Sequence, residues 1–214
     1  MKVYFLRHGE TEWNREKRIQ GSTEWTDLTG KGVREAEAAR DWILAEGLTF
    51  DRMYSSPYRR ALHTAHIIGR GIGLEPMVDN RLREISFGPY EGTQYGEGLF
   101  ADDNIRFCFK DPPRYMARDG GESFDDVASR VKDFFDSELA PLAKSLANVL
   151  VVAHGGILRT VVRLATAVPL ADFWKGSQPN CCMHIVDFSD GRISIDARAV
   201  TFAPHLGISS DSAS

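Results

Sequence analysis

The sequence predicts an α/β fold in three layers, with a mainly parallel central sheet between two layers of helices. Along the 214 residues, short apolar runs alternate with segments whose apolar residues recur at helical spacing. This alternation is typical of parallel sheets with helical connections. The run VLVVA at 149–153 contains no polar residue, as expected for a strand that is covered on both faces.

Strands are expected where short apolar runs are bounded by polar or turn-forming residues. The four runs with this pattern stand at 3–6, 52–54, 149–153 and 183–188. The run at 52–54 is the weakest of the four, and the run at 149–153 is the strongest. A shorter extended stretch is expected around 76–79.

Helices are expected between these strands, with ends marked by capping residues and glycines. Thr29 is expected to cap a helix that runs to about Glu46, because apolar residues recur at helical spacing behind it. A second helix is expected over 58–68. Gly69 and Gly71 follow it, and they are expected to end it because glycine is common at helix C-termini.

Two more helices are expected in the second half of the chain. Ser123 and Asp126 resemble a capping box ahead of a helical pattern, in which each side chain bonds to the other residue's backbone. Pro141 is expected to kink or end this helix because proline lacks a backbone N–H. The last predicted helix covers 157–167.

The chain is expected to form a single domain over residues 1–206, since its length is close to that of one α/β domain. The segment at about 92–121 carries aromatic residues among mixed charges with weak periodicity. We interpret it as an insertion that covers a site like a lid, or that forms a secondary hydrophobic cluster; the two are compatible. Residues 207–214 are small and polar and are expected to be a flexible tail.

The composition favours a cytoplasmic protein with no nucleic-acid or membrane partner. The 26 basic and 30 acidic residues give a formal net charge of −4, so any site for an anion must be local. Cys108, Cys181 and Cys182 are an odd number and do not form the even framework of a disulfide-rich secreted domain. No apolar run is long enough to cross a bilayer.

Polar residues that are suited to catalysis follow the predicted strands directly. Arg7 and His8 follow the first strand, and His154 follows the strand at 149–153. Arg60 and Glu84 follow the remaining extended stretches. Because parallel strands end at one edge of a sheet, where open α/β sheets bind ligands, we expect these five side chains to converge.

The five groups suit the transfer of a phosphoryl group. Arg7 and Arg60 present planar forks that match phosphate oxygens, and a neutral His8 is a competent nucleophile toward phosphorus. His154 is expected to be cationic and to stabilise charge on the phosphoryl oxygens. Glu84 is expected to give a proton to the leaving alkoxide and later to take one from water.

Two further features of the sequence concern backbone amides and metal ligands. Gly155 and Gly156 open the helix after His154, so their amides are expected to approach the anion at the positive end of the helix dipole. His63 and His66 lie three residues apart, but no third ligand at suitable spacing accompanies them. We therefore expect no metal site.

An ordered set of motifs resembles one known family, the histidine phosphatase superfamily, which is also called the phosphoglycerate mutase-like family. The resemblance extends over about residues 1–206. It rests on RHGETEWN at 7–14, RIQG at 18–21, SSP at 55–57 with RA at 60–61, LRE at 82–84, GES at 121–123 and HGG at 154–156.

The resemblance implies a phosphoglycerate mutase-like fold and a role for each matched residue. His8 would be the phosphorylated nucleophile, Arg7, Arg60 and His154 the rest of the phosphate pocket, and Glu84 the proton donor. Contacts to phosphate or substrate would come from Asn14, Gln20, Gly21 and Gly155. The family needs no metal or organic cofactor. Two adjacent arginines, Arg59 and Arg60, stand at this motif. We assign the phosphate contact to Arg60, because it stands next to Ala61 as in the family pattern.

The function expected from the sequence is a metal-independent phosphatase that hydrolyses small phosphomonoesters through a phosphohistidine on His8. One alternative is phosphoryl transfer of the phosphoglycerate mutase type, and another is a module that binds phosphate or a phosphoprotein without turnover. The expected partner is a small phosphorylated metabolite, and the sequence is compatible with a homodimer.

Overall fold

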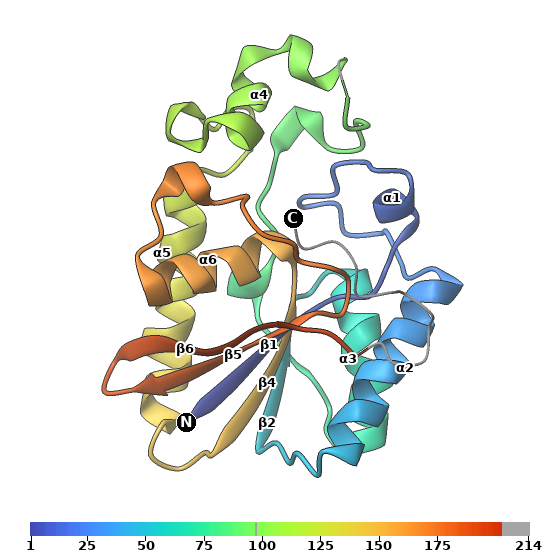
Figure 1. Cartoon of the computed structure of the whole chain (residues 1–214), viewed down its shortest axis with the longest axis vertical. Coiled ribbons are helices and arrows are strands. Elements are labelled where there is room, and N and C mark those ends of the chain that lie inside the picture. The colour runs from blue at the N-terminus through green and yellow to red at the C-terminus, as the bar shows by residue number, and fades with distance from the viewer. Residues whose placement is uncertain (97, 203–214) are drawn as a thin grey trace.

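The computed structural model describes residues 1–96 and 98–202, which form a six-stranded sheet between helices (Figure 1). The strand order is β3-β2-β4-β1-β5-β6. The strands are β1 (Lys2–Arg7), β2 (Arg52–Ser55), β3 (Met77–Val78), β4 (Asn148–Ala153), β5 (Met183–Ser189) and β6 (Arg192–Val200). The first four run parallel to one another, whereas β5 pairs antiparallel with β1, and β6 pairs antiparallel with β5. The predicted α/β class with a mainly parallel sheet is confirmed.

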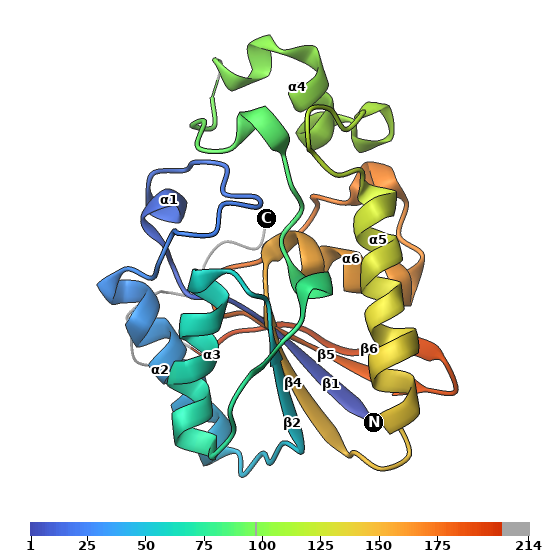
Figure 2. The same cartoon turned by 180° about the vertical axis from the view of Figure 1, so that it is seen from behind.

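Two pairs of helices cover the two faces of the sheet, as Figures 1 and 2 show from opposite sides. On one face lie α2 (Gly30–Ala45) and α3 (Arg59–Ile72), and on the other lie α5 (Phe124–Asp133) and α6 (Gly155–Thr166). The short α1 (Glu12–Arg15) and α4 (Asp103–Lys110) lie beyond the carboxyl ends of the parallel strands. The predicted three layers are therefore present.

The central strands alternate between two separate hydrophobic cores. In β1, Val3 and Phe5 pack toward α5 and α6, whereas Tyr4 and Leu6 pack toward α2 and α3. Strand β4 lies between β1 and β2 and is buried from Val149 to Ala153. Burial on both faces explains why this run carries no polar residue.

The predicted cap of α2 is confirmed, but the predicted end of α3 is wrong. Thr29 precedes α2, and its hydroxyl accepts a hydrogen bond from the Gly32 amide at 3.0 Å. Helix α3 continues through Gly69 to Ile72 and is capped by Gly73, whose φ is +74°. A Cβ at Gly69 would lie 2.3 Å from the carbonyl oxygen of Leu74. Gly69 therefore permits a close approach of the chain and does not end the helix.

The helix after Ser123 begins as predicted and ends in two irregular turns. Ser123 and Asp126 form the capping box of α5. The chain then continues as a π-helix at Phe134–Leu139 and a 3-10 turn at Ala140–Leu142. Pro141 lies in the first turn of that 3-10 segment, where a missing N–H costs least.

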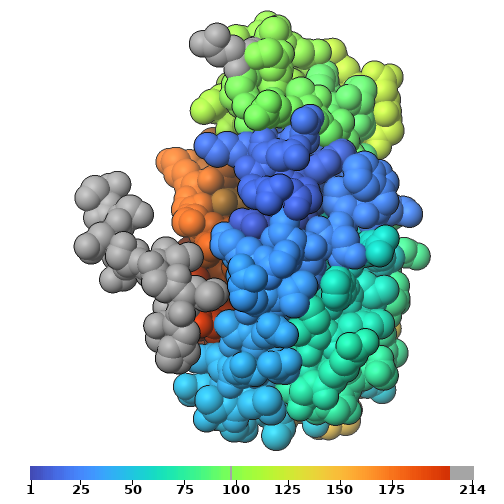
Figure 3. Space-filling view, turned by 90° about the vertical axis from the view of Figure 1, so that its right-hand side faces the viewer, coloured from blue at the N-terminus to red at the C-terminus, as the bar shows by residue number. Residues whose placement is uncertain are grey.

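The remaining differences concern the ends of the chain and the segment at 92–121. Strand β6 was not predicted; it is an edge strand in which no residue is buried, so it carries no continuous apolar run. The segment at 92–121 contains α4 and short turns, and in Figure 3 its green surface adjoins the blue residues that follow β1. The predicted tail at 207–214 lies outside the described residues. In the described part of the chain, no helix is long and apolar enough to cross a membrane.

Candidate active site

A cavity of about 350 Å³ opens at the carboxyl edge of the parallel strands. Of the nine residues to which the family resemblance gives a role, eight line the cavity, and the ninth, His154, is buried next to His8. The eight are Arg7, His8, Asn14, Gln20, Gly21, Arg60, Glu84 and Gly155.

The imidazole of His8 is buried and is held in one tautomer. It follows β1, is 3% exposed, and its Nδ1 lies 2.8 Å from the carbonyl oxygen of Gly9. Because a carbonyl oxygen only accepts, Nδ1 carries the hydrogen and Nε2 keeps its lone pair. Burial, together with the positive charges of Arg60 and Arg7, lowers the pKa of His8 well below its usual value. His8 is therefore neutral at pH 7, which is the form that a nucleophile requires.

His154 is fully buried, and its ring centroid lies 5.2 Å from that of His8. Its Nε2 lies 2.7 Å from the hydroxyl of Ser56, and its Nδ1 has no partner in the described part of the chain. Burial and the nearby Arg60 lower the pKa of His154 well below its usual value. Desolvation and the neighbouring positive charges both disfavour a cationic ring here. The cationic His154 expected beside a bound phosphate stays a prediction.

Arg60, in the first turn of α3, is clamped by the loop around Gly21. Its Nη2 donates to the Gly21 carbonyl at 2.8 Å, and its Nη1 donates to the Thr26 hydroxyl at 3.1 Å. Burial lowers the pKa of Arg60 to about 10, so the guanidinium stays charged at pH 7. The neighbouring Arg59 is exposed and pairs with Asp27 at 2.7 Å. The structure thus brings Arg60, and not Arg59, into the cavity.

Arg7 is the second guanidinium in the cavity. Its Nη1 donates to the backbone carbonyl of Gln178. The Nε atoms of Arg7 and Arg60 are both buried and have no partner among residues 1–96 and 98–202. Two buried cationic donors that lack acceptors match an anionic ligand such as a phosphoryl group.

Glu84 bridges its own chain segment and the start of α6. Its Oε2 accepts from the Gly156 amide at 3.0 Å, and its Oε1 accepts from the Ile85 amide at 3.0 Å. A Cβ at position 156 would lie 2.4 Å from Glu84 Oε1, so this approach requires glycine. The predicted role of the Gly156 amide at the anion is therefore wrong, since the amide is bonded to the carboxylate. Gly155 does line the cavity.

The side-chain amides of Asn14 and Gln20 are oriented by hydrogen bonds to their oxygen atoms. Asn14 Oδ1 accepts from the Asn180 amide group at 3.1 Å and from the Thr11 amide at 3.2 Å. Gln20 Oε1 accepts from the Thr26 hydroxyl at 3.0 Å. Because the oxygens are occupied, the NH₂ groups of Asn14 and Gln20 are the ends that suit an anionic ligand.

Sequence reasoning missed the outer part of the cavity. Arg159 had no signal beyond its place in the helix after His154, and its guanidinium lies 5.5 Å from the Trp174 ring. Tyr95 belongs to the segment at 92–121, and Phe109 of that segment stacks on Phe87 at 5.5 Å. The missed residues that line the cavity are Trp13, Lys17, Arg18, Phe87, Tyr95, Arg159, Trp174 and Gln178.

Replacing Arg60 by alanine is expected to weaken inhibition by inorganic phosphate about 30-fold, because charge-assisted hydrogen bonds contribute about 2 kcal/mol. Turnover of a phosphomonoester should slow as well. The matched control is Arg59→Ala, which removes the adjacent exposed guanidinium. Inhibition constants measured for both variants check the prediction, and equal weakening in the two would contradict it.

The fold and the cavity together define a class of protein. A neutral histidine, two guanidinium groups and one carboxylate at the carboxyl edge of a parallel sheet are characteristic of an α/β enzyme that acts on an anionic substrate. The chain belongs to the histidine phosphatase superfamily (branch 1), whose sequence profile matches residues 3–201.

Named relatives and solved structures support this membership. The chain is 35% identical to a 2,3-bisphosphoglycerate-dependent phosphoglycerate mutase of Methylorubrum extorquens, over 75% of this chain and 76% of the relative. It is 29% identical to a mycobacterial glucosyl-3-phosphoglycerate phosphatase solved with VO₃, with a TM-score of 0.79 and coverages of 94% and 99%. A phosphoserine phosphatase of Entamoeba histolytica with 3-phosphoglyceric acid is 26% identical, with a TM-score of 0.79 and coverages of 94% and 97%.

Proposed function

We propose that the protein is a cytoplasmic, metal-independent phosphatase that hydrolyses small phosphomonoesters through a phosphohistidine on His8. The observation that carries the proposal is a buried, neutral His8 whose unprotonated Nε2 shares a cavity with Arg7, Arg60 and Glu84. The neutral ring is ready to attack phosphorus, and the two cations balance the charge of the phosphoryl oxygens.

The proposed reaction has two in-line transfers. In the first, His8 Nε2 forms a bond to phosphorus while the bond from phosphorus to the leaving oxygen breaks, and Glu84 gives its proton to that oxygen. In the second, water gives a proton to Glu84 and attacks phosphorus, which releases inorganic phosphate and restores His8. Arg7, Arg60 and a protonatable His154 would hold the phosphoryl group in both transfers.

The charges around the outer cavity support a leaving group that is itself anionic. Lys17, Arg18 and Arg159 line this part, and Glu84 is the one carboxylate that lines the described cavity. The whole chain, in contrast, has a net charge of −4. The E. histolytica relative is solved with 3-phosphoglyceric acid. We therefore include phosphorylated hydroxy acids and phosphoserine among the candidate substrates.

Lys17 is the residue that tests this substrate class. Its backbone is left-handed, with φ of +54°, and its side chain makes no ion pair with any described residue. Lys17→Ala is expected to raise KM for 3-phosphoglycerate about tenfold, since losing one charge-assisted contact costs about 1.4 kcal/mol. KM for glycerol 3-phosphate, which has the phosphate but no carboxylate, should change less than about twofold.

The control for Lys17 is Lys144→Ala, which removes an exposed lysine that precedes β4, at the opposite edge of the sheet. Initial rates on both esters check the prediction. Equal changes in KM for the two esters would contradict a carboxylate contact at Lys17.

The proposed function is tested by phosphate release from a panel of phosphorylated acids, sugars and aryl esters, with and without 2,3-bisphosphoglycerate. Phosphate release that does not depend on bisphosphoglycerate supports the phosphatase. Isomerisation of 3-phosphoglycerate without phosphate release would instead support the mutase. This alternative is included because of the similarity to the M. extorquens enzyme. Binding of esters without any conversion would support the non-catalytic module.

A further inference from the structure

An ion pair between Glu122 and Arg130 contacts the chain segment that carries Glu84. Arg130 on α5 donates through Nε to Glu122 Oε1 at 2.9 Å and through Nη2 to Glu122 Oε2 at 3.0 Å. The two side chains are only 13% and 23% exposed. A two-pronged pair with this much burial has a fixed geometry, unlike most surface ion pairs.

The pair holds the backbone on both sides of Glu84. Arg130 Nη1 donates to the carbonyl oxygen of Arg81 at 2.6 Å and to that of Arg83 at 2.7 Å. On the other side, Glu122 Oε2 accepts from the Ser86 amide at 3.0 Å, and the Glu122 amide donates to the Ser86 carbonyl at 2.8 Å. The residues from 81 to 86 are thus tied to one ion pair, with Glu84 in their middle.

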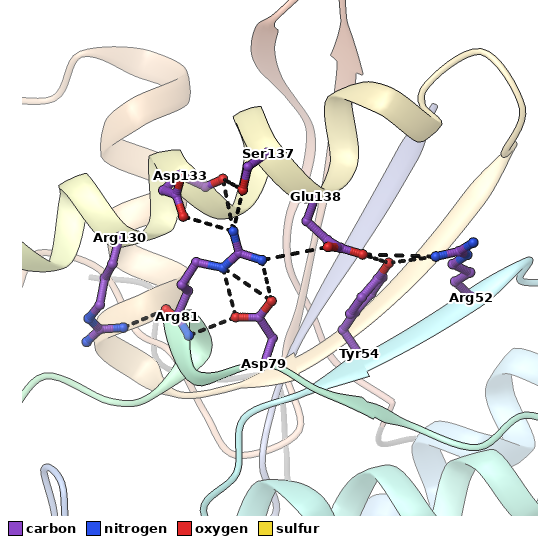
Figure 4. Close-up of polar contacts among 8 residues, drawn as sticks. All are labelled: Arg52, Tyr54, Asp79, Arg81, Arg130, Asp133, Ser137 and Glu138. Atoms are coloured by element: carbon purple, nitrogen blue, oxygen red, sulfur yellow. Dashed lines mark hydrogen bonds and ion pairs between the residues drawn. The ribbon is translucent and has the colours of Figure 1, made fainter.

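The turn at Arg81 is itself anchored from its outer side (Figure 4). The Arg81 guanidinium bonds to Asp79 through Nε at 2.9 Å and to Asp133 through Nη1 at 2.8 Å. Figure 4 also shows Arg130 reaching the backbone of Arg81 from the other side. The carbonyl that Arg130 binds therefore belongs to a turn with little freedom to move.

We propose that the Glu122–Arg130 pair positions the carboxylate of Glu84 for proton transfer to the leaving group. The proposal rests on the proposed function, in which Glu84 is the acid. Proton transfer requires the carboxyl group within hydrogen-bond reach of the leaving oxygen, and small displacements of a reacting group cost large factors in rate. Arg130 and Glu122 do not line the cavity, so they act through Glu84 and are positioning residues.

Arg130→Lys is the sharpest test, because it keeps the charge and removes the planar fork. The planar guanidinium of Arg130 binds both carboxylate oxygens of Glu122 and two backbone carbonyls at the same time. A lysine ammonium cannot make all of these contacts. We expect kcat/KM for an alkyl phosphate to fall about 30-fold and that for p-nitrophenyl phosphate to fall less than about threefold. Only the alkoxide needs the proton that Glu84 supplies.

A double-mutant cycle separates positioning from general damage. In the Glu84→Gln background, adding Arg130→Lys should change the alkyl-to-aryl ratio of kcat/KM less than about twofold, because the acid is already absent. A full additional loss in that background, or equal losses on both esters in the single variant, would overturn the proposal. Glu122→Gln should lower the ratio in the same direction, and it provides the readout if Arg130→Lys does not fold.

The control is Arg163→Lys, which alters a looser pair with Asp125 at 3.9 Å between α6 and α5. It should leave the ratio unchanged. Failure of the proposed function itself gives a different result, because the wild-type protein would then release no phosphate from either ester. A wild-type enzyme that turns over both esters, with a ratio that Arg130→Lys leaves intact, would overturn the positioning role alone.

Discussion

Replacing His8 by alanine is expected to lower phosphate release from any phosphomonoester by at least about 10,000-fold, because it removes the attacking atom. The other groups of the cavity remain in this variant. Arg7, Arg60 and Glu84 should therefore still bind substrate or phosphate. Initial rates and equilibrium binding, measured on the same preparation, separate the two effects.

The control for His8 is His63→Ala. His63 is a half-exposed histidine on α3 that pairs with Asp27 at 2.7 Å and lies outside the cavity lining. Its loss should leave turnover within about twofold of wild type. A folded His8→Ala protein with more than a hundredth of wild-type turnover would contradict the role of His8 as nucleophile.

Replacing Glu84 by glutamine is expected to lower kcat/KM for alkyl phosphates about 300-fold, and that for p-nitrophenyl phosphate less than about tenfold. Glutamine fills the same volume and still accepts hydrogen bonds, but it has no proton to give to an alkoxide. A nitrophenolate leaves without that proton. The difference between the two esters, measured by steady-state kinetics, therefore reports on acid catalysis.

The control for Glu84 is Glu138→Gln, which changes a carboxylate that binds Tyr54 outside the cavity (Figure 4). It should leave the alkyl-to-aryl ratio of kcat/KM unchanged. Losses of the same size on alkyl and aryl esters in Glu84→Gln would argue against Glu84 as the proton donor.

The parts of the fold and site that could be predicted depend on local sequence. The apolar run of β4 predicted a doubly covered strand, and His8 and His154 follow β1 and β4 directly. Their approach to each other then follows from the parallel pairing of those two strands. The cap at Thr29 is likewise set by residues a few positions apart.

The parts that could not be predicted depend on contacts between distant residues. The run of α3 past Gly69 is decided by the close approach of Leu74. The Gly156 amide bonds to Glu84, which lies 72 residues away in the chain. The lowered pKa of His154 reflects its burial close to Arg60, and no sequence pattern reports burial of that kind.

The central claim is that the phosphoryl group passes through His8, and trapping the phosphoenzyme tests it most directly. The wild-type protein is mixed with a slowly hydrolysed aryl phosphate and quenched in alkali, which preserves phosphohistidine, and its peptides are then analysed by mass spectrometry. We expect one added phosphoryl group on the imidazole of His8 and none in the Arg60→Ala or His8→Ala proteins at matched times. A phosphoryl group on another residue, or rapid turnover with His8 unmodified throughout, would contradict the account.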